Sequence, residues 1–172
     1  MRIITGIYKG RHFDIPRTFK ARPTTDFAKE NIFNVLNGYI DLEDAIALDL
    51  FSGTGSISLE LVSRGCQSVI SVEADRDHHA FIKQCLKKLG TDRCIALRGD
   101  VFRFIKSCHQ QFDFIFADPP YALPELPTLP MKNTQQDIQE ISNAFGFPNA
   151  SYFGTFFKKQ VGVSPQQYRK NL

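Results

Sequence analysis

The chain has 172 residues, of which 42% are hydrophobic, and its formal net charge is +3. This length and apolar content suit one packed globular domain, or one domain and a fragment, and the mildly basic charge permits a nucleic-acid partner without requiring one. No apolar run has the length of a membrane span or the form of a signal peptide, so we expect a cytoplasmic protein. The four cysteines form no C-x-x-C pair, which predicts reduced thiols and no metal site; they are Cys66, Cys85, Cys94 and Cys108.

The first segment, Arg2 to Ile15, alternates imperfectly between apolar and polar residues and has turn points at Gly6 and Gly10. This pattern predicts a β-hairpin. Residues 1–30 hold seven basic and three acidic side chains, a local charge of +4 that exceeds the +3 of the whole chain. The segment is therefore either an ordinary solvated hairpin or an arm that grips RNA phosphates through polar positions, which are Arg2, Lys9 and Arg11.

The sequence RPTTD at residues 22–26 leads into a predicted helix. Thr25 and Asp26 are both of the residue types that cap helix N-termini. We expect this helix to lie across the sheet with one apolar face inward, made of Ala28, Ile32, Val35 and Leu36.

Four apolar runs alternate with helical patterns in the middle of the chain and predict a parallel sheet covered on both faces. The runs cover residues 46–48, 68–72, 94–97 and 112–117, and the helical patterns begin at Ser56, Asp75 and Val101. Ligand sites of open α/β sheets lie just beyond the carboxyl ends of the strands. Candidate site residues are therefore the acids that follow the four runs, which are Asp49, Glu73, Asp100 and Asp118.

Two adjacent histidines, His78 and His79, fall on the first turns of the helical pattern at residues 75–89. Neighbouring positions do not share a helical face, and neither histidine has a partner at metal-ligand spacing. We predict that both are solvated.

A glycine loop joins the first strand to its helix within the sequence ALDLFSGTGS at residues 47–56. Gly53 and Gly55 let the backbone turn sharply and let a ligand approach closely. Glu73 follows 20 residues after Gly53, where an acid can accept both hydroxyls of a ribose. The absence of a GxxxxGK[ST] sequence argues against a nucleotide-phosphate loop. Taken alone, the loop also fits a plain strand-to-helix turn without a ligand.

The pattern changes after Tyr121, and the 51 residues that follow do not resemble strands. Prolines at positions 124, 127 and 130 predict a linker over residues 123–136. We expect tail helices at residues 138–145 and 150–160 and a third that starts at Ser164-Pro165, with Asn149 and Ser164 as N-caps. The sheet would then be truncated after its fourth strand, which would lie at an open edge.

Six stretches resemble, in order, the bacterial 16S ribosomal RNA guanine-N2 methyltransferase family: MRIITGIYKGR, ARPTTDFAKENIFNVL, DLFSGTGS, VEAD, GDVFRF and DPPYAL. The resemblance covers residues 1–129, and DPPY is its most specific part because that motif marks methylation of exocyclic amines. It implies a Rossmann-like class I α/β methyltransferase fold with S-adenosyl-L-methionine as cofactor. The implied partner is ribosomal RNA or an assembly intermediate of the small ribosomal subunit.

The same resemblance implies roles for individual residues. Asp118 and the Pro119 carbonyl would accept the two N–H bonds of the target amine, Pro119 and Pro120 would fix the direction of that carbonyl, and Tyr121 would stack on the base. Arg22 and Thr24 would line the cleft between the cofactor and the base. The cofactor would be bound by Asp49, Phe51, Gly53, Gly55, Glu73, Ala74, Asp100 and Val101. Loop or helix caps are the alternative roles of Asp49 and Asp100.

The stretch DIQEISNAFGFPNASYFGTFFKKQVGVSPQQYRKN resembles the second helix-turn-helix half of AraC-type transcriptional regulators. That DNA-binding unit has two such halves, so we do not expect this tail to bind DNA independently. We predict a methyltransferase core at residues 1–122 with an RNA-binding hairpin at 1–20, a proline-rich linker at 123–136, and a helix-turn-helix-like tail at 137–172. The alternatives are a DNA adenine or protein-glutamine methyltransferase and a DNA-binding regulator fragment.

Overall fold

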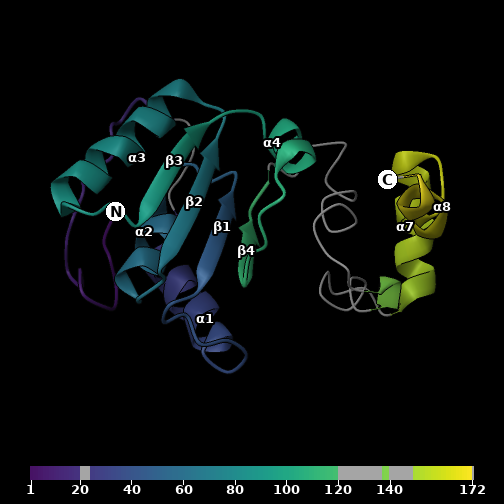
Figure 1. Ribbon diagram of the computed structural model, residues 1–172, viewed down its shortest axis with the longest axis horizontal. Coiled ribbons are helices and arrows are strands. Elements are labelled where there is room, and N and C mark those ends of the chain that lie inside the picture. The colour runs from purple at the N-terminus through teal and green to yellow at the C-terminus, as the bar shows by residue number, and fades with distance from the viewer. Residues whose placement is uncertain (20–23, 120–136, 140–148, 172) are drawn as a thin grey trace. The chain divides into compact units, whose positions relative to one another are not determined.

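The computed structural model describes residues 1–19, 24–119, 137–139 and 149–171, and the chain divides into two compact units, Met1–Asp118 and Pro119–Leu172. The first unit contains α1 (Asp26–Leu36), β1 (Ile46–Leu50), α2 (Ser56–Ser63), β2 (Ser68–Glu73), α3 (Arg76–Leu89), β3 (Cys94–Arg98), α4 (Val101–Ser107) and β4 (Phe114–Ala117). The second unit contains α7 (Ala150–Val161) and α8 (Pro165–Lys170) (Figure 1). Among the helices of these described ranges, none has the length and apolar content needed to cross a bilayer.

In the described part of the chain, the four parallel strands form one sheet in the order β3-β2-β1-β4 (Figure 1). The register pairs Leu50 of β1 with both Val72 of β2 and Ala117 of β4, and it pairs Val72 with Leu97 of β3. The carboxyl ends of the four strands therefore meet at one edge. This arrangement confirms the predicted α/β sheet, although β4 begins at Phe114 rather than at residue 112.

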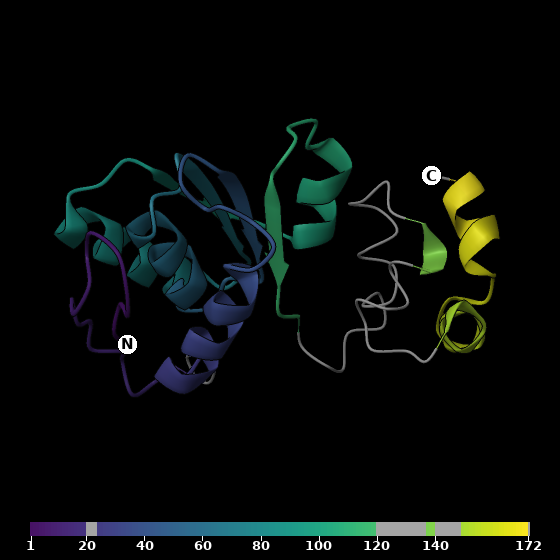
Figure 2. The same ribbon diagram turned by 90° about the horizontal axis from the view of Figure 1, so that it is seen from below.

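The helices α2 and α3 pack side by side on one face of the sheet (Figure 2). All eight residues of α2 are buried, whereas α3 buries one regular stripe, which is Phe81, Ile82, Cys85, Leu86 and Leu89. Both ends of α3 follow from the sequence. The Asp75 carboxylate caps the N-terminus by accepting the Asp77 and His78 amides, and Gly90 ends the helix at a φ of 68°.

The helix α1 begins as predicted, because the Thr25 hydroxyl accepts the Ala28 amide at 3.1 Å. Its inward face matches the prediction only in part, because Ile32 and Leu36 pack against the core as expected but the most buried positions are other ones. Phe33 and Lys29 are its buried residues, whereas Val35 is 61% exposed. The Lys29 ammonium lies 3.9 Å from Glu60 of α2 and donates a hydrogen bond to the Arg2 carbonyl, so a charged residue takes an inward position that the apolar pattern did not assign.

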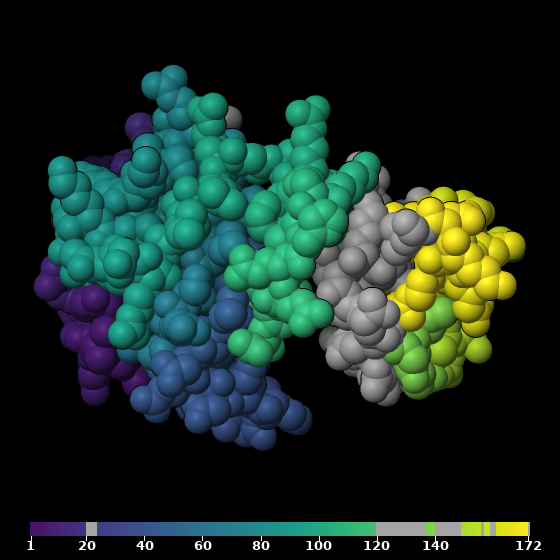
Figure 3. All heavy atoms as spheres, in the orientation of Figure 1, coloured from purple at the N-terminus to yellow at the C-terminus, as the bar shows by residue number. Residues whose placement is uncertain are grey.

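The N-terminal arm, residues 1–13, forms a shorter hairpin than the predicted one. Ile3 and Gly10 join its two sides through backbone hydrogen bonds, and Arg2 pairs with His12 in a single antiparallel bridge. The arm is also hydrogen-bonded to α2. The Ile4 and Thr5 amides donate to the two oxygens of the buried Glu60 carboxylate at 2.8 and 2.9 Å. Figure 3 shows the arm (purple) lying against the surface of α3 (teal).

The prediction that His78 and His79 are solvated is wrong. The His78 side chain is 13% exposed, and its ring packs edge-on against Phe19 at 4.4 Å between centroids. The Nε2 atom of His79 lies 3.1 Å from the carbonyl oxygen of Ala96 in β3. Both rings face neighbours that are distant in sequence, so the local pattern could not reveal them.

In the second unit, the predicted caps of the tail helices are confirmed. The Asn149 side chain accepts the Ser151 and Tyr152 amides at the start of α7, and Ser164 with Gln167 forms a capping box before Pro165 in α8. Phe153 and Phe157 of α7 form a small core, to which Ile138, Val161 and Tyr168 contribute. The helix expected at residues 138–145 and the linker expected at 123–136 lie largely or wholly outside the described residues.

Candidate functional site

A cavity of about 120 Å³ opens at the carboxyl ends of β1 and β4. It is lined by Thr24, Asp49, Phe51, Ser52, Gly53, Thr54, Ser56, Ile57, Phe116 and Asp118. The structure thus gathers five of the predicted site residues from three separate segments: the RPTTD sequence, the glycine loop and the start of DPPY. This is the edge at which open α/β sheets hold their ligands.

The glycine loop owes its tight course to three left-handed residues. Phe51, Gly53 and Gly55 have φ values of 59°, 54° and 73°. This conformation costs Phe51 about 1–2 kcal/mol, and its ring packs against Phe102 at 6.2 Å between centroids. At Gly55 a side chain is also excluded by space, because a Cβ would lie 2.8 Å from the Cγ1 atom of Ile82.

Asp49 lies beneath this loop and is 1% exposed. Its Oδ2 atom accepts hydrogen bonds from the Ser58 amide at 3.0 Å and from the Ser58 hydroxyl at 2.5 Å. Burial raises the pKa of Asp49 to about 7, with a smaller contribution from the charges of Glu73 and Asp118 and with opposition from the two Ser58 hydrogen bonds. Asp49 therefore holds the first turn of α2, which is the loop-holding role that its position suggests.

Glu73 joins the glycine loop to the segment that follows β2. Its Oε2 atom accepts the Gly53 amide at 2.7 Å, and its Oε1 atom accepts the Asp75 amide at 2.8 Å. Ala74 lies between these two contacts and is exposed. Glu73 does not line the cavity itself, but it fixes the position of Gly53, which does. Its role as a ribose ligand stays a prediction.

Asp100 and Val101 stand at the start of α4, outside the wall of this cavity. The Asp100 carboxylate accepts the Arg103 amide at 2.9 Å and so caps the helix, while Val101 is buried. The neighbouring Gly99 amide donates to the Glu73 carbonyl at 3.0 Å, which brings the ends of β2 and β3 together. A cofactor role for Asp100 and Val101 stays a prediction.

The DPPY motif is described only in part. Asp118 ends the first unit and lines the cavity, and Pro119 is the next residue of the chain. Pro120 and Tyr121 lie outside the described residues, as does Arg22 of the RPTTD sequence.

The predicted RNA-binding residues of the arm are held by contacts within the first unit. Arg2 forms an ion pair with Asp26 at 2.9 Å, and the Arg11 guanidinium donates to the Lys88 carbonyl at 2.8 Å. Arg2 and Lys9 line a hollow of about 480 Å³ together with Glu30 and Arg64, and Arg11 does not.

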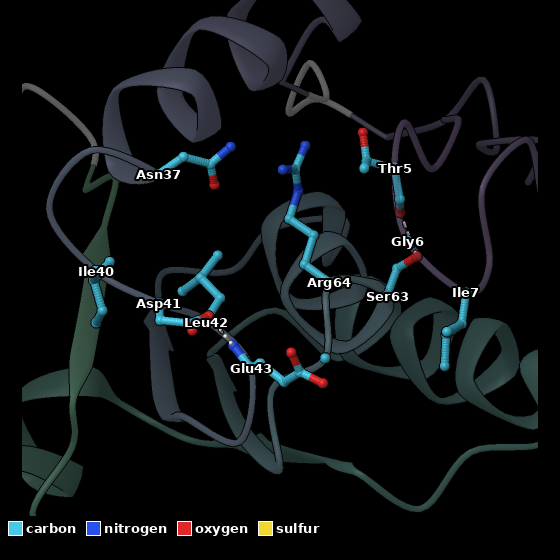
Figure 4. Close-up of a pocket in the computed structure, with 11 residues that line it drawn as sticks. Thr5, Gly6, Ile7, Asn37, Ile40, Asp41, Leu42, Glu43, Ser63 and Arg64 are labelled. Carbon is cyan, nitrogen blue, oxygen red and sulfur yellow. Dashed lines mark hydrogen bonds between the residues drawn. The ribbon is translucent and has the colours of Figure 1, made fainter.

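A larger hollow of about 760 Å³ lies beside the arm and the end of α2 (Figure 4). Figure 4 shows Arg64 reaching between Asn37 and Thr5. The Arg64 guanidinium is already bonded to Glu60 at 3.1 Å and lies over the Phe33 ring at 4.3 Å. Because none of the predicted site residues lines this hollow, the smaller cavity at the strand ends is the candidate site.

Sequence reasoning missed Ser56, which lines the candidate site and is 4% exposed. Its hydroxyl has no hydrogen-bond partner in the described part of the chain. A signal existed in the sequence, because Ser56 directly follows the last glycine of the loop and opens α2.

Two family models match the chain. A family model described as "Conserved hypothetical protein 95" matches residues 1–142, and a model described as "Helix-turn-helix domain" matches residues 129–171. The chain is 33% identical to "Ribosomal RNA small subunit methyltransferase D" of Escherichia coli K12 over 70% of its length and 60% of that protein. It is 34% identical to the protein of that name in Haemophilus influenzae over 70% of its length and 64% of that protein.

Solved structures show the same fold. "Putative methyltransferase yhhF" from Escherichia coli has a TM-score of 0.67 and 29% identity, over 80% of this chain and 75% of that one. Precorrin-6y C5,15-methyltransferase from Geobacter metallireducens has a TM-score of 0.58 at 15% identity, over 78% of this chain and 74% of that one, and shows the fold alone. The chain spans between 60% and 71% of the length of the first four curated relatives.

Proposed function

Because the chain belongs to the family described as "Conserved hypothetical protein 95", whose model matches residues 1–142, we propose that it methylates ribosomal RNA with S-adenosyl-L-methionine. The proposed target is the exocyclic N2 amine of a guanine in small-subunit ribosomal RNA, free or within an assembly intermediate. The names of the relatives from Escherichia coli and Haemophilus influenzae support the substrate class. The observation that carries the proposal is the single cavity lined by Thr24, the glycine loop and Asp118.

The residues around this cavity fit the cofactor. Asp49 and Asp118 line it, and the Asp118 carboxylate suits a ligand that carries sulfonium and ammonium charges. The buried Ser56 hydroxyl, which has no partner among the described residues, offers a donor to an acceptor on the ligand. When bound, S-adenosyl-L-methionine supplies the methyl group. We propose that Gly53 and Gly55 give it room, with Glu73 as the ribose ligand.

The proposed role of Asp118 is to orient the target amine. The lone pair of an exocyclic guanine amine is delocalised into the ring, so this nitrogen is a poor nucleophile. An acceptor on one N–H favours a pyramidal nitrogen whose lone pair is available. Asp118 is suited to this because the pairing of Ala117 with Leu50 fixes the end of β4. Holding both reactants in place can lower the barrier by roughly 7–11 kcal/mol.

The rest of the motif completes this proposal. Pro119, Pro120 and Tyr121 follow Asp118 directly in the chain, where the Pro119 carbonyl would accept the second N–H of the amine and the Tyr121 ring would stack on the base.

We propose that the hollow lined by Arg2 and Lys9 contacts RNA phosphates, since basic side chains there would position the RNA without reading its sequence.

The test is transfer of a labelled methyl group to small-subunit ribosomal RNA that lacks the modification. Label is expected in the RNA and, after nuclease digestion, at guanine N2. Asp118→Ala should lower the rate by about 100-fold or more, because it removes an oriented group at the reacting nitrogen. Asp92→Ala, the same change at an exposed acid outside the cavity wall, is the matched control. Label that enters DNA or peptide instead would favour the rival methyltransferase functions.

A second candidate function is DNA binding by the tail, which the helix-turn-helix match at residues 129–171 favours. A gel shift without cofactor tests it. Binding through phosphate contacts should weaken steeply between low and physiological salt, and retained affinity at physiological salt would support a regulator function.

A further inference from the structure

Phe27 presents an aromatic ring to solvent at the start of α1, on the face where an amphipathic helix normally carries polar residues. The residue is 74% exposed. The opposite face anchors the helix, because Lys29 and Phe33 are buried and Ile32 packs against the core. A ring with two rotatable bonds on an anchored helix loses little conformational entropy when it is covered, so Phe27 is suited to contact a flat ligand.

The candidate site lies directly before this ring in the chain. Thr24 lines the cavity, and the Thr25 hydroxyl caps α1 by accepting the Ala28 amide at 3.1 Å. Three residues span at most about 11 Å, so the Cα atoms of Thr24 and Phe27 lie within that distance of each other. Phe27 is therefore close enough to the cavity to contact the nucleotide next to one that is bound there.

The same face of α1 leads to the hollow of about 480 Å³ beside the N-terminal arm. Phe27, Asn31 and Asn34 are exposed and have the i, i+4, i+7 spacing of one helical face. Asn34 lines the hollow together with Arg2 and Lys9. Seven residues of helix separate Phe27 from Asn34, which is about 10 Å along the axis. The outer face of α1 thus joins the hollow to the candidate site.

The charges of the hollow suit RNA as the partner of this face. Its wall carries three basic side chains and one acidic one, which are Arg2, Lys9, Arg64 and Glu30. A single strand of RNA offers phosphates to the basic side chains and bases to an exposed ring. When a target base leaves its stack, the neighbouring base loses a stacking partner, and an aromatic side chain can take that place.

We propose that Phe27 stacks on the base next to the target nucleotide, while phosphates of the same strand contact the hollow at the other end of the face. The inference rests on the proposed function, because it takes RNA as the substrate and the cavity as the place of the target base. It assigns Phe27 as an RNA-binding residue in addition to the arm and the DPPY motif.

The test compares RNA with a ligand that has phosphates but no bases. Equilibrium titration of the full chain measures its affinity for small-subunit ribosomal RNA that lacks the modification and for inorganic polyphosphate. Phe27→Ala should weaken RNA binding by about tenfold, because it removes one base–aromatic stack. It should change polyphosphate binding by less than about twofold.

Two further variants control for the ring and for its position. Phe27→Tyr should keep the RNA affinity of the original chain, because a base stacks on either ring. Tyr39→Ala removes an aromatic side chain that is 85% exposed and lines neither the cavity nor the hollow, so it should leave RNA binding unchanged.

The salt dependence of RNA binding gives a second readout. Phe27 carries no charge, so Phe27→Ala should lower the affinity by the same factor at every salt concentration. Lys9→Ala removes a proposed phosphate contact and should reduce the slope of log affinity against log salt concentration by about 1. A change of this slope in Phe27→Ala would mean that the phosphate contacts themselves were disturbed, and it would overturn the stacking role.

Other results would also overturn the proposal. RNA affinity that is unchanged in Phe27→Ala, or weakened equally in Tyr39→Ala, would show that no base stacks specifically on Phe27. Unchanged RNA affinity with lost self-association in sedimentation would assign the ring to a contact between copies of the chain. A lower melting temperature, or weaker binding of S-adenosylhomocysteine (the demethylated form of the cofactor), would assign the ring to support of the fold or of the cavity.

These outcomes separate the inference from the function on which it rests. Weaker RNA binding by Phe27→Ala in a chain that transfers no methyl group would uphold the RNA contact and contradict the proposed reaction. Methyl transfer with an unchanged KM for RNA in Phe27→Ala would do the reverse. A chain that binds no RNA would overturn both.

Discussion

Asp49 shows how the fold controls the protonation of one residue. Its carboxyl is buried under the glycine loop, and burial raises its pKa to about 7 from the ordinary value of 3.8. In the folded chain the group therefore keeps its proton up to about pH 7, whereas in the unfolded chain it loses the proton near pH 4. Unfolding between these limits releases a proton, so this residue lowers the free energy of unfolding as the pH rises from about 4 to about 7.

Replacing this acid by its neutral amide should remove the pH dependence that it causes. Asp49→Asn keeps an oxygen that can accept the Ser58 amide and hydroxyl, but it has no proton to lose. We expect the variant to lose less stability than the original chain between about pH 4 and about pH 7, as measured by urea unfolding. Parallel curves for the two chains would show that Asp49 does not titrate in this range.

At the scale of elements, the N-terminal arm and α2 fit together through close backbone contact. The Ile7 amide donates to the Ser63 carbonyl at 2.8 Å, and the Ser63 hydroxyl accepts the Tyr8 amide and donates to the Thr5 carbonyl. Gly6 lies against the same residue. The arm that the sequence predicts as an RNA-binding hairpin is thus also a structural part of the first unit.

Two glycines of the arm allow this contact to be measured. At Gly6 (φ +87°) an added Cβ would lie 1.7 Å from the Ser63 carbonyl oxygen, whereas at Gly10 (φ +81°) nothing lies within 4 Å. Gly10→Ala should cost only the left-handed strain of about 1–2 kcal/mol. Gly6→Ala should cost several kcal/mol more, because the arm must leave α2. Thermal or urea unfolding of both variants measures the difference, and equal losses would contradict the close contact.

How much of each element the sequence predicts depends on where its partners lie. The apolar runs and the residues that cap or end the helices locate β1 to β4, α2 and α3, because these signals are local. The burial of Lys29 and Glu60 could not be predicted from local patterns, since each contacts partners far along the chain. Ser56 was missed for a related reason. Only the folded cavity shows that its hydroxyl lacks a partner.

At the scale of the whole molecule, the chain combines two compact units. One family model matches residues 1–142, which include the whole first unit, and the other matches residues 129–171 of the second unit. The cavity and the residues that line it belong to Met1–Asp118, while the aromatic core of the tail belongs to Pro119–Leu172. We predict that cofactor binding depends on the first unit and does not require a folded tail.

The tail core gives a way to test this independence in the full chain. Phe157 is fully buried and packs against Phe153 at 5.7 Å and Tyr168 at 5.5 Å between ring centroids. Phe157→Ala should cost about 3–5 kcal/mol, which is enough to unfold a unit with so small a core. Hydrogen exchange should then show lost protection in α7 and α8, while S-adenosylhomocysteine affinity stays within about twofold of the original value. The exposed Tyr152 of the same helix supplies the matched control, since Tyr152→Ala removes an aromatic ring without opening the core. A loss of cofactor affinity in Phe157→Ala alone would mean that the candidate site needs the tail.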